Sequence, residues 1–324
     1  MCTDPGGARV EVGYWLASEE YGPRELVAQA QAAREHGLTR FAISDHYHPW
    51  TESQGHSPFV WSVIAAVAAT VPDAHVTTFV TCPTLRIHPA VVAQAAATSS
   101  LLLDGRFTFG LGSGENLNEH VLGDRWPHTD ERHAMLEEAV EVMRRLWSGD
   151  QVTHEGRHYT VVNARLYDPP AATIPVPISA FGPKALDLAA RVNDGYVASG
   201  PMADLVDGYR GRGGEGPVIG GFKVCFRDDE DEARELAHRM WPNESMPGEL
   251  AQELPTVAHM EQAVSNVTVD DVAGSVVCGP DPEAYLGRLR EFEDAGFDVV
   301  HVQPIGGRVG EFLGFLTDEV LPRR

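Results

Sequence analysis

The chain has very few lysines and few cysteines, and both scarcities limit what it can do. Its 324 residues include only Lys184 and Lys223 as lysines and carry a formal net charge of −22. A surface this acidic repels phosphate backbones and anionic lipid headgroups, so we expect no nucleic-acid partner and no membrane partner. The 4 cysteines form no C-x-x-C pair, which indicates free thiols and neither a disulfide framework nor a zinc site: Cys2, Cys82, Cys225 and Cys278.

Long apolar runs are also missing. No segment approaches the ~20 consecutive apolar residues that cross a bilayer, and the first residues, MCTDPGGARVEVGYW, contain neither a basic region nor an apolar signal core. We therefore expect a cytoplasmic protein. The chain is 43% hydrophobic, and hydrophobic cores stop growing at roughly 250–300 residues, which together predict a single domain over residues 1–324.

Short strand-like runs alternate with amphipathic helical patterns along most of the chain. The first pairs are ARVEVGYWL with RELVAQAQAAREHG, TRFAIS with SPFVWSVIAAVAATV, and AHVTTFVT with HPAVVAQAAATSSLL; the last strand is FDVVHVQPIG. Strands that each precede a helix predict an α/β fold with a parallel sheet, and at this length the (β/α)8 TIM barrel is favoured. An open doubly wound sheet is the alternative, but the first strand-to-helix turn lacks its G-x-G-x-x-G phosphate loop.

Two segments interrupt the alternation. Residues 148–174, after the fourth strand and its helix, place a turn between two alternating runs in GDQVTHEGRHYTV and predict a β-hairpin. Residues 227–275 are charged, irregular and contain proline. They predict a long helical excursion before the eighth strand.

Polar residues follow several of the predicted strands. SDHYHPW (44–50) follows the second strand, TCPT (81–84) the third and GSGENLN (112–118) the fourth. In a parallel barrel the carboxyl ends of the strands share one rim, where reactive groups lie, so we expect His46 and Glu115 to meet there. An imidazole and a tuned carboxyl group can exchange protons near neutral pH. The alternatives are a structural histidine that binds a loop carbonyl and a carboxylate at a helix start.

The loop after the fifth strand, AFGPK (180–184), is a candidate anion site. Free N–H groups at the start of the next helix, together with Lys184, would point toward the barrel mouth and attract a phosphate. The alternative is that Gly182 and Pro183 only begin that helix.

The ordered set of these motifs resembles a known family. SDHYHPW, LGSGENLNEH, WPHTDERHAMLEEAVEVMRRLWSGD, LYDPP and VPISAFGPKALDLAARVNDGYVASGP are similar, in order and spacing, to the luciferase-like (β/α)8-barrel superfamily. The nearest branch holds coenzyme F420-dependent oxidoreductases related to glucose-6-phosphate dehydrogenase. The resemblance covers residues 10–200 and resumes at VVCGPDPEAYLGRLREFEDAGFDVVHVQPIG. It implies F420 as cofactor, with FMN as the alternative, and a homodimer.

The resemblance also implies roles for individual residues. Asp45 would hold the cofactor ring, His46 would exchange a proton with the substrate, Trp50 would stack near the reacting carbon, and Glu115 would be the proton partner of the reduced cofactor. A bulge with a non-proline cis peptide, at Phe79 and Val80, would lie behind the ring. Further cofactor-lining positions match Cys82, Ser113, Gly114 and Asn118, and the loop over the phosphate matches Ala180, Phe181, Gly182 and Pro183.

A deazaflavin exchanges hydride and does not form the oxygen adduct of luciferases, so the resemblance implies a dehydrogenase or reductase. The sugar-phosphate enzyme of this branch uses lysines where this chain has Pro201 and Gly274. Charge-assisted hydrogen bonds contribute roughly 1.5–3 kcal/mol each, so we expect an uncharged alcohol, carbonyl or unsaturated compound as substrate, and not glucose 6-phosphate.

Three other functions remain open at the sequence level. An FMN-dependent monooxygenase would use the same scaffold. His46 and His48 form the H-x-H pattern of metal-dependent barrel hydrolases, although VVHVQPIGG supplies no acidic ligand after the last strand. A non-catalytic cofactor-binding protein would not require both His46 and Glu115.

Overall fold

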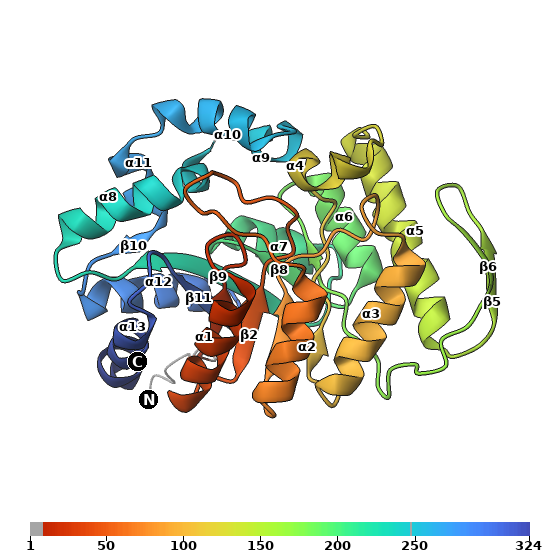
Figure 1. Ribbon diagram of the computed structural model, residues 1–324, viewed down its shortest axis with the longest axis horizontal. Coiled ribbons are helices and arrows are strands. Elements are labelled where there is room, and N and C mark those ends of the chain that lie inside the picture. Colours follow the sequence, from red (N-terminus) through yellow and green to blue (C-terminus); the bar gives the residue numbers. More distant parts are fainter. Residues whose placement is uncertain (1–8, 247) are drawn as a thin grey trace.

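The computed structural model describes residues 9–246 and 248–324, and at its centre lies a curved parallel sheet surrounded by helices (Figure 1). The strands run in the order β4-β3-β2-β1-β11-β9-β8-β7, with parallel pairing between neighbours. They are β1 (Glu11–Leu16), β2 (Arg40–Ile43), β3 (His75–Thr78), β4 (Phe107–Thr108), β7 (Ile178–Ser179), β8 (Tyr196–Ala198), β9 (Val218–Cys225) and β11 (Val299–Pro304).

The sheet closes between β4 and β7. Leu111, just beyond β4, bridges to Thr81 on one side and to Ile178 on the other. Its N–H donates to the Pro177 carbonyl at 3.0 Å, and its own carbonyl accepts from Ser179 N–H at 2.8 Å. A closed barrel leaves no unpaired sheet edge, and the predicted (β/α)8 barrel is confirmed.

Helices cover the outside of the barrel because the strands alternate between inward and outward side chains. Trp15, Ala42 and Phe79 belong to an inner cluster, whereas Tyr14 and Phe41 belong to the larger cluster under the helices. Proline is the first residue of four of these helices, where its missing N–H costs nothing. The helices are α1 (Pro23–Glu35), α2 (Val60–Thr70), α3 (Pro89–Leu102), α5 (Thr129–Trp147), α6 (Pro183–Val192), α7 (Ala203–Gly211), α12 (Pro282–Asp294) and α13 (Val309–Phe315), followed by η4 (Leu316–Val320) and η5 (Leu321–Arg323).

Both predicted insertions are present. The first is an antiparallel hairpin of β5 (Val152–Glu155) and β6 (Thr160–Ala164). The second arches over the top of the barrel in Figure 1, and its α9 (Leu250–Glu253) lies against α4 (Asn116–Glu119), which η1 (His120–Leu122) follows. It contains α8 (Glu230–Met240), η2 (Pro242–Ser245), α9 (Leu250–Glu253), α10 (Val257–Ala263), η3 (Val264–Asn266) and α11 (Val269–Ser275), and β10 (Val277–Cys278) then pairs with the end of β9.

The sequence pattern missed some local features. The segment after β8 reads as irregular but forms α7, and α4 was not expected within the loop after β4. Cys82, Cys225 and Cys278 are free thiols as predicted, and Cys2 lies outside the described residues. Within residues 9–246 and 248–324, every helix is too short or too polar to cross a membrane.

Candidate active site at the barrel mouth

His46 lies in the loop that leaves β2 and is 9% exposed. Its Nδ1 is 3.1 Å from Glu19 Oε1, a carboxylate from the loop after β1. The Trp50 ring packs edge-to-face on the imidazole with the ring centroids 5.0 Å apart. The Ser57 hydroxyl donates to the His46 carbonyl at 2.8 Å and holds the backbone of the loop. His46 is therefore fixed through its ring and its backbone, with one ring nitrogen facing a carboxylate.

Asn118, which is completely buried, joins the loop of His46 to the loop of Glu115. Its Oδ1 accepts from the backbone N–H groups of Tyr47 and His48, at 2.9 and 3.0 Å. Its Nδ2 is 3.4 Å from Glu115 Oε2, toward which it donates. One amide therefore ties together two loops that are about seventy residues apart in sequence.

Asp45 belongs to a buried charged triad. Arg86 Nη2 donates to Asp45 Oδ1 at 2.9 Å, and the backbone N–H of Arg86 donates to Glu119 Oε2 at 3.0 Å. Arg86 Nε also lies 3.6 Å from Glu119 Oε1. Burial raises the pKa of the Glu119 carboxyl to about 7, although the neighbouring Arg86 opposes that shift. Two carboxyl groups thus share one guanidinium below the mouth.

The segment that follows β3 carries the expected cis peptide. The peptide between Phe79 and Val80 is cis, as the resemblance implied. Gly114 has a φ of +81°, and a Cβ there would come within 2.6 Å of Cys82 Sγ. The glycine therefore lets the loop after β4 lie directly against Cys82, whose thiol is 3.0 Å from Thr84 Oγ1. Ser113 is half-buried beside them.

The loop after β7 is the candidate anion site. Ala180 is buried and its carbonyl accepts from the Tyr196 hydroxyl at 2.8 Å, whereas Phe181 is exposed. Gly182 and Pro183 begin α6. Lys184 Nζ, however, pairs with Asp130 at 2.6 Å on an exposed part of the surface. Its charge therefore faces a carboxylate of α5 in this structure, and both side chains are largely exposed.

Several polar atoms at the carboxyl ends of the strands are buried without a hydrogen-bond partner among the described residues. They include Asp45 Oδ2, Glu19 Oε2, His46 Nδ1, Thr81 Oγ1 and both amide atoms of Gln303. A buried polar atom without a partner costs free energy. Such atoms at the rim of a barrel fit a ligand that carries donors and acceptors, as a deazaflavin ring does.

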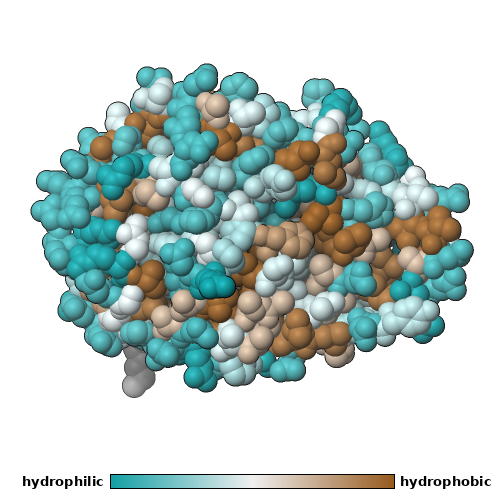
Figure 2. Space-filling view, viewed as in Figure 1, coloured by the Kyte–Doolittle hydropathy of each residue, from teal (hydrophilic) through white to brown (hydrophobic). Residues whose placement is uncertain are grey.

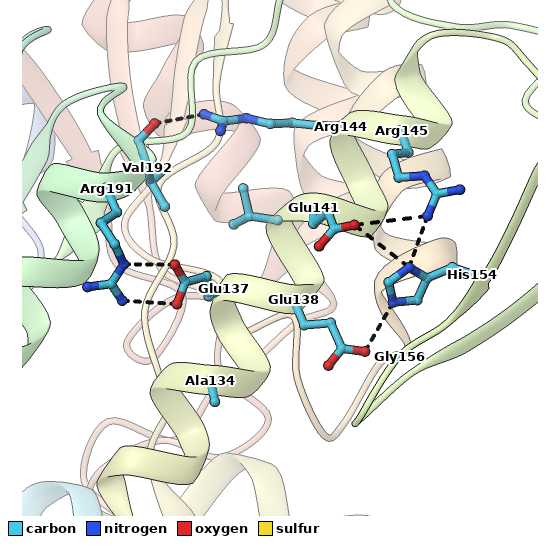
Figure 3. Close-up of a pocket in the computed structure, with 11 residues that line it drawn as sticks. Ala134, Glu137, Glu138, Glu141, Arg144, Arg145, His154, Gly156, Arg191 and Val192 are labelled. Atoms are coloured by element: carbon cyan, nitrogen blue, oxygen red, sulfur yellow. Dashed lines mark hydrogen bonds and ion pairs between the residues drawn. The ribbon is translucent and has the colours of Figure 1, made fainter.

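A groove of about 700 Å³ between α5, α6 and the hairpin differs from the mouth in this respect (Figure 3). Its charged side chains already bind one another: Arg191 pairs with Glu137 at 2.8 Å and His154 with Glu138 at 3.1 Å. These charged side chains therefore have partners within the protein and do not require a ligand.

The H-x-H pattern does not bring a set of metal ligands together in the part of the chain that the structure describes. His48 Nδ1 lies 2.8 Å from the Leu117 carbonyl, and its ring stacks on His120.

Sequence reasoning missed Glu19, Arg86, Glu119 and Lys223. Glu19 lies in the ASEEY turn after the first strand, so its rim position was a usable signal. Arg86 and Glu119 are each within two residues of loop positions already singled out, Thr84 and Asn118.

Three comparisons place the chain among known proteins. Residues 8–299 match the family model of the luciferase-like monooxygenases. An F420-dependent glucose-6-phosphate dehydrogenase of Nakamurella multipartita is 33% identical over 97% of this chain and 96% of its own length. A structure of an F420-dependent secondary alcohol dehydrogenase with an F420-acetone adduct is 27% identical, with a TM-score of 0.87 over 97% of this chain and 98% of its own.

More distant likeness concerns the fold alone. The FMN-bound oxygenating component of 3,6-diketocamphane monooxygenase from Pseudomonas putida is 17% identical, with a TM-score of 0.70, and the match covers 97% of this chain and 98% of that one. The chain therefore belongs to the luciferase-like monooxygenase family, in the branch of the F420-dependent dehydrogenases, and is an oxidoreductase.

Proposed function

We propose that the chain binds F420 at the barrel mouth and transfers hydride between it and a small uncharged alcohol or carbonyl compound. The observation that carries this proposal is the group of His46, Glu19 and Trp50, joined through Asn118 to the loop of Glu115. Relatives that are named F420-dependent dehydrogenases support the choice of cofactor.

The cofactor side of the site is assigned to residues around Asp45. A bound deazaflavin would supply a ring carbon that accepts or releases hydride. Asp45 Oδ2 and Thr81 Oγ1, both buried and without partners, are acceptors available to it. Phe79, Val80, Cys82, Ser113 and Gly114 would line the ring, and Ala180 to Pro183 would lie over its phosphate.

The substrate side is assigned to His46. Glu19 Oε1 lies 3.1 Å from Nδ1, and we assign Nε2, the ring nitrogen that does not face this carboxylate, as the base that takes the hydroxyl proton of an alcohol. Trp50 packs against the ring and excludes water from this face. Glu115 would give a proton to the reduced ring in this direction. In the reductive direction His46 would return its proton to the substrate, and Glu115 would take a proton back from the cofactor side.

The relatives' sugar-phosphate substrate is not carried over to this chain. The resemblance implies that Pro201 and Gly274 stand where that enzyme has lysines, and Lys184 is paired with Asp130. An uncharged substrate fits this loss of cations, and the secondary alcohol dehydrogenase among the structural relatives supports it.

A binding titration with F420, FMN and NADPH tests the proposed cofactor. We expect F420 to quench the tryptophan fluorescence with the tightest affinity, because the deazaflavin branch contains the nearer relatives. Tight FMN binding with weak F420 binding would favour the monooxygenase alternative. The FMN-bound monooxygenase component described above is similar to this chain in fold alone.

Replacing Glu115 with glutamine should remove one ionisation from the pH profile of kcat and slow turnover ~10²-fold, the usual scale for an acid–base group. The amide cannot donate or accept the second proton. Steady-state rates across pH 5–9 measure the effect, with Glu155→Gln on the exposed hairpin as the matched control. A full-speed variant with the wild-type pH profile would contradict the role.

We also propose that the chain forms a homodimer through α2 and α3. Residues 57–71 and 89–103 contain no charged side chain, although the chain carries a net charge of −22. Phe59, Val91 and Leu102 are each more than half exposed. They border a groove of about 310 Å³, and brown and pale surface lies over these helices in Figure 2. An uncharged apolar face lets two acidic chains meet without repulsion.

Val91→Glu is expected to convert the dimer to a monomer in sedimentation equilibrium, because two new carboxylates would face each other across the interface. Val162→Glu, on the exposed face of β6, is the matched control and should leave the mass unchanged. A wild-type protein that sediments as a monomer would sink the dimer proposal and leave the proposed chemistry untouched.

A further inference from the structure

Lys223 is a buried cation inside the barrel. It lies on β9, a strand whose residues are all buried, and is 5% exposed. Its ammonium group lies 2.6 Å from Glu244 Oε1, a carboxylate of η2 in the excursion. It also lies over the indole rings of Trp15 and Trp241, at 4.6 and 4.5 Å from their centroids. The charge is therefore enclosed by two aromatic faces and one carboxylate.

Both indoles connect this cation to the residues around His46. Trp15 Nε1 donates to Ser44 Oγ at 3.1 Å, just before Asp45 and His46 in the chain. Trp241 Nε1 donates to Glu20 Oε2 at 2.8 Å, and Glu20 follows Glu19, the partner of His46. The two indoles that enclose the lysine are therefore hydrogen-bonded to the loops that carry His46 and Glu19.

The neighbour of Lys223 on β11 is Gln303, which faces it in the parallel register. Gln303 is completely buried, and both its amide oxygen and its amide nitrogen are without a partner among the described residues. Gln303 thus offers an amide that is open to hydrogen bonding, whereas the charge of the neighbouring Lys223 is already neutralised by Glu244.

We propose that Glu244 masks Lys223 and is a specificity-determining residue that makes the site prefer uncharged substrates over phosphorylated ones. This inference rests on the proposed function and extends it. An anion that approaches Lys223 meets the Glu244 carboxylate first, and it must displace a counter-ion 2.6 Å away to gain the ammonium group. Like-charge repulsion in a desolvated site is strong because little water screens it.

Removing the Glu244 carboxylate should shift the preference toward the phosphorylated substrate. In Glu244→Gln the ammonium group loses its counter-ion, and a phosphoryl group can replace it. We expect the ratio of kcat/KM for glucose 6-phosphate to kcat/KM for 2-propanol, both with F420, to rise at least tenfold over the wild-type ratio. In the double variant Lys223→Met, Glu244→Gln no cation remains, and the ratio should return to the wild-type value.

An unchanged ratio in folded Glu244→Gln, or a raised ratio that persists in the double variant, would overturn the proposal. Thermal-shift titration with glucose 6-phosphate tests it without turnover and without Glu244→Gln. We expect the ligand to leave the melting temperatures of wild type and Lys223→Met equally unchanged; stabilisation of wild type alone would mean that Lys223 is open to anions. Failure of the proposed function appears separately, as no F420 binding by wild type.

Discussion

His46→Ala is expected to lower turnover ~10²-fold or more, the scale of a general acid–base group, while the affinity for F420 stays nearly the same. The imidazole is the group held by Glu19 and Trp50, and its loss leaves the substrate hydroxyl without a base. Asp45, which is assigned to the cofactor ring, remains bound to Arg86 in this variant. Single-turnover rates and F420 titration measure the two quantities separately.

His36→Ala provides the control, because His36 is an exposed histidine at the end of α1 and binds only a carbonyl of its own helix. It should turn over like wild type. A single-turnover rate in His46→Ala equal to that of wild type would refute the assignment of the base.

Arg86→Leu is expected to have the largest effect on stability, with a loss of ~3–5 kcal/mol in the free energy of unfolding, as when one partner of a buried ion pair is removed. The side chain of Arg86 is 7% exposed, and those of Asp45 and Glu119 are each 1% exposed. Without the guanidinium, two carboxyl groups stay buried without a cation. Chemical denaturation measures the loss, and F420 affinity should fall with it because Asp45 is no longer held.

The loss should depend on pH. Burial already raises the pKa of Glu119 to about 7, above its usual value of 4.5. Its native state therefore binds a proton that the unfolded state releases, so the free energy of unfolding falls as pH rises above the unfolded value. Arg86 opposes this shift, so its removal should raise the pKa of Glu119 further. The free energy of unfolding of Arg86→Leu should therefore be lower at pH 8 than at pH 5.

Arg34→Leu is the matched control for Arg86→Leu. Arg34 also pairs with an aspartate, Asp73, at 3.1 Å, but both side chains are 49% exposed. Exposed pairs contribute about 0–1 kcal/mol, so this variant should unfold almost like wild type. Equal losses in the free energy of unfolding would mean that the buried triad of Asp45, Arg86 and Glu119 stabilises the fold no more than an exposed ion pair does.

The barrel and the main features of its rim could be predicted because they follow from short-range patterns. Strand-like runs such as TRFAIS alternate with apolar helical periodicity, and parallel strands bring their carboxyl ends to one rim. His46 and Glu115 share that rim, and their loops are joined by Asn118. The resemblance, and not the periodicity, supplied the cis peptide at Phe79 and Val80.

Contacts between distant segments could not be predicted. Lys223 and Glu244 meet only because the excursion folds back over the mouth, and nothing in a charged irregular segment indicates where its η2 turn will lie. The same holds for Lys184, whose partner Asp130 comes from the start of α5. A lone cation after a strand indicates an anion site only until its counter-ion is known.

The most direct test of hydride transfer at this mouth is stopped-flow reduction of F420 by 2-propanol that carries deuterium at C2. We predict that wild type reduces bound F420 in a single turnover, more slowly with the deuterated alcohol, forms acetone, and consumes no oxygen. Oxygen consumption with bound FMN would contradict the account. So would bound F420 that no uncharged alcohol reduces and whose reduced form no carbonyl compound reoxidises.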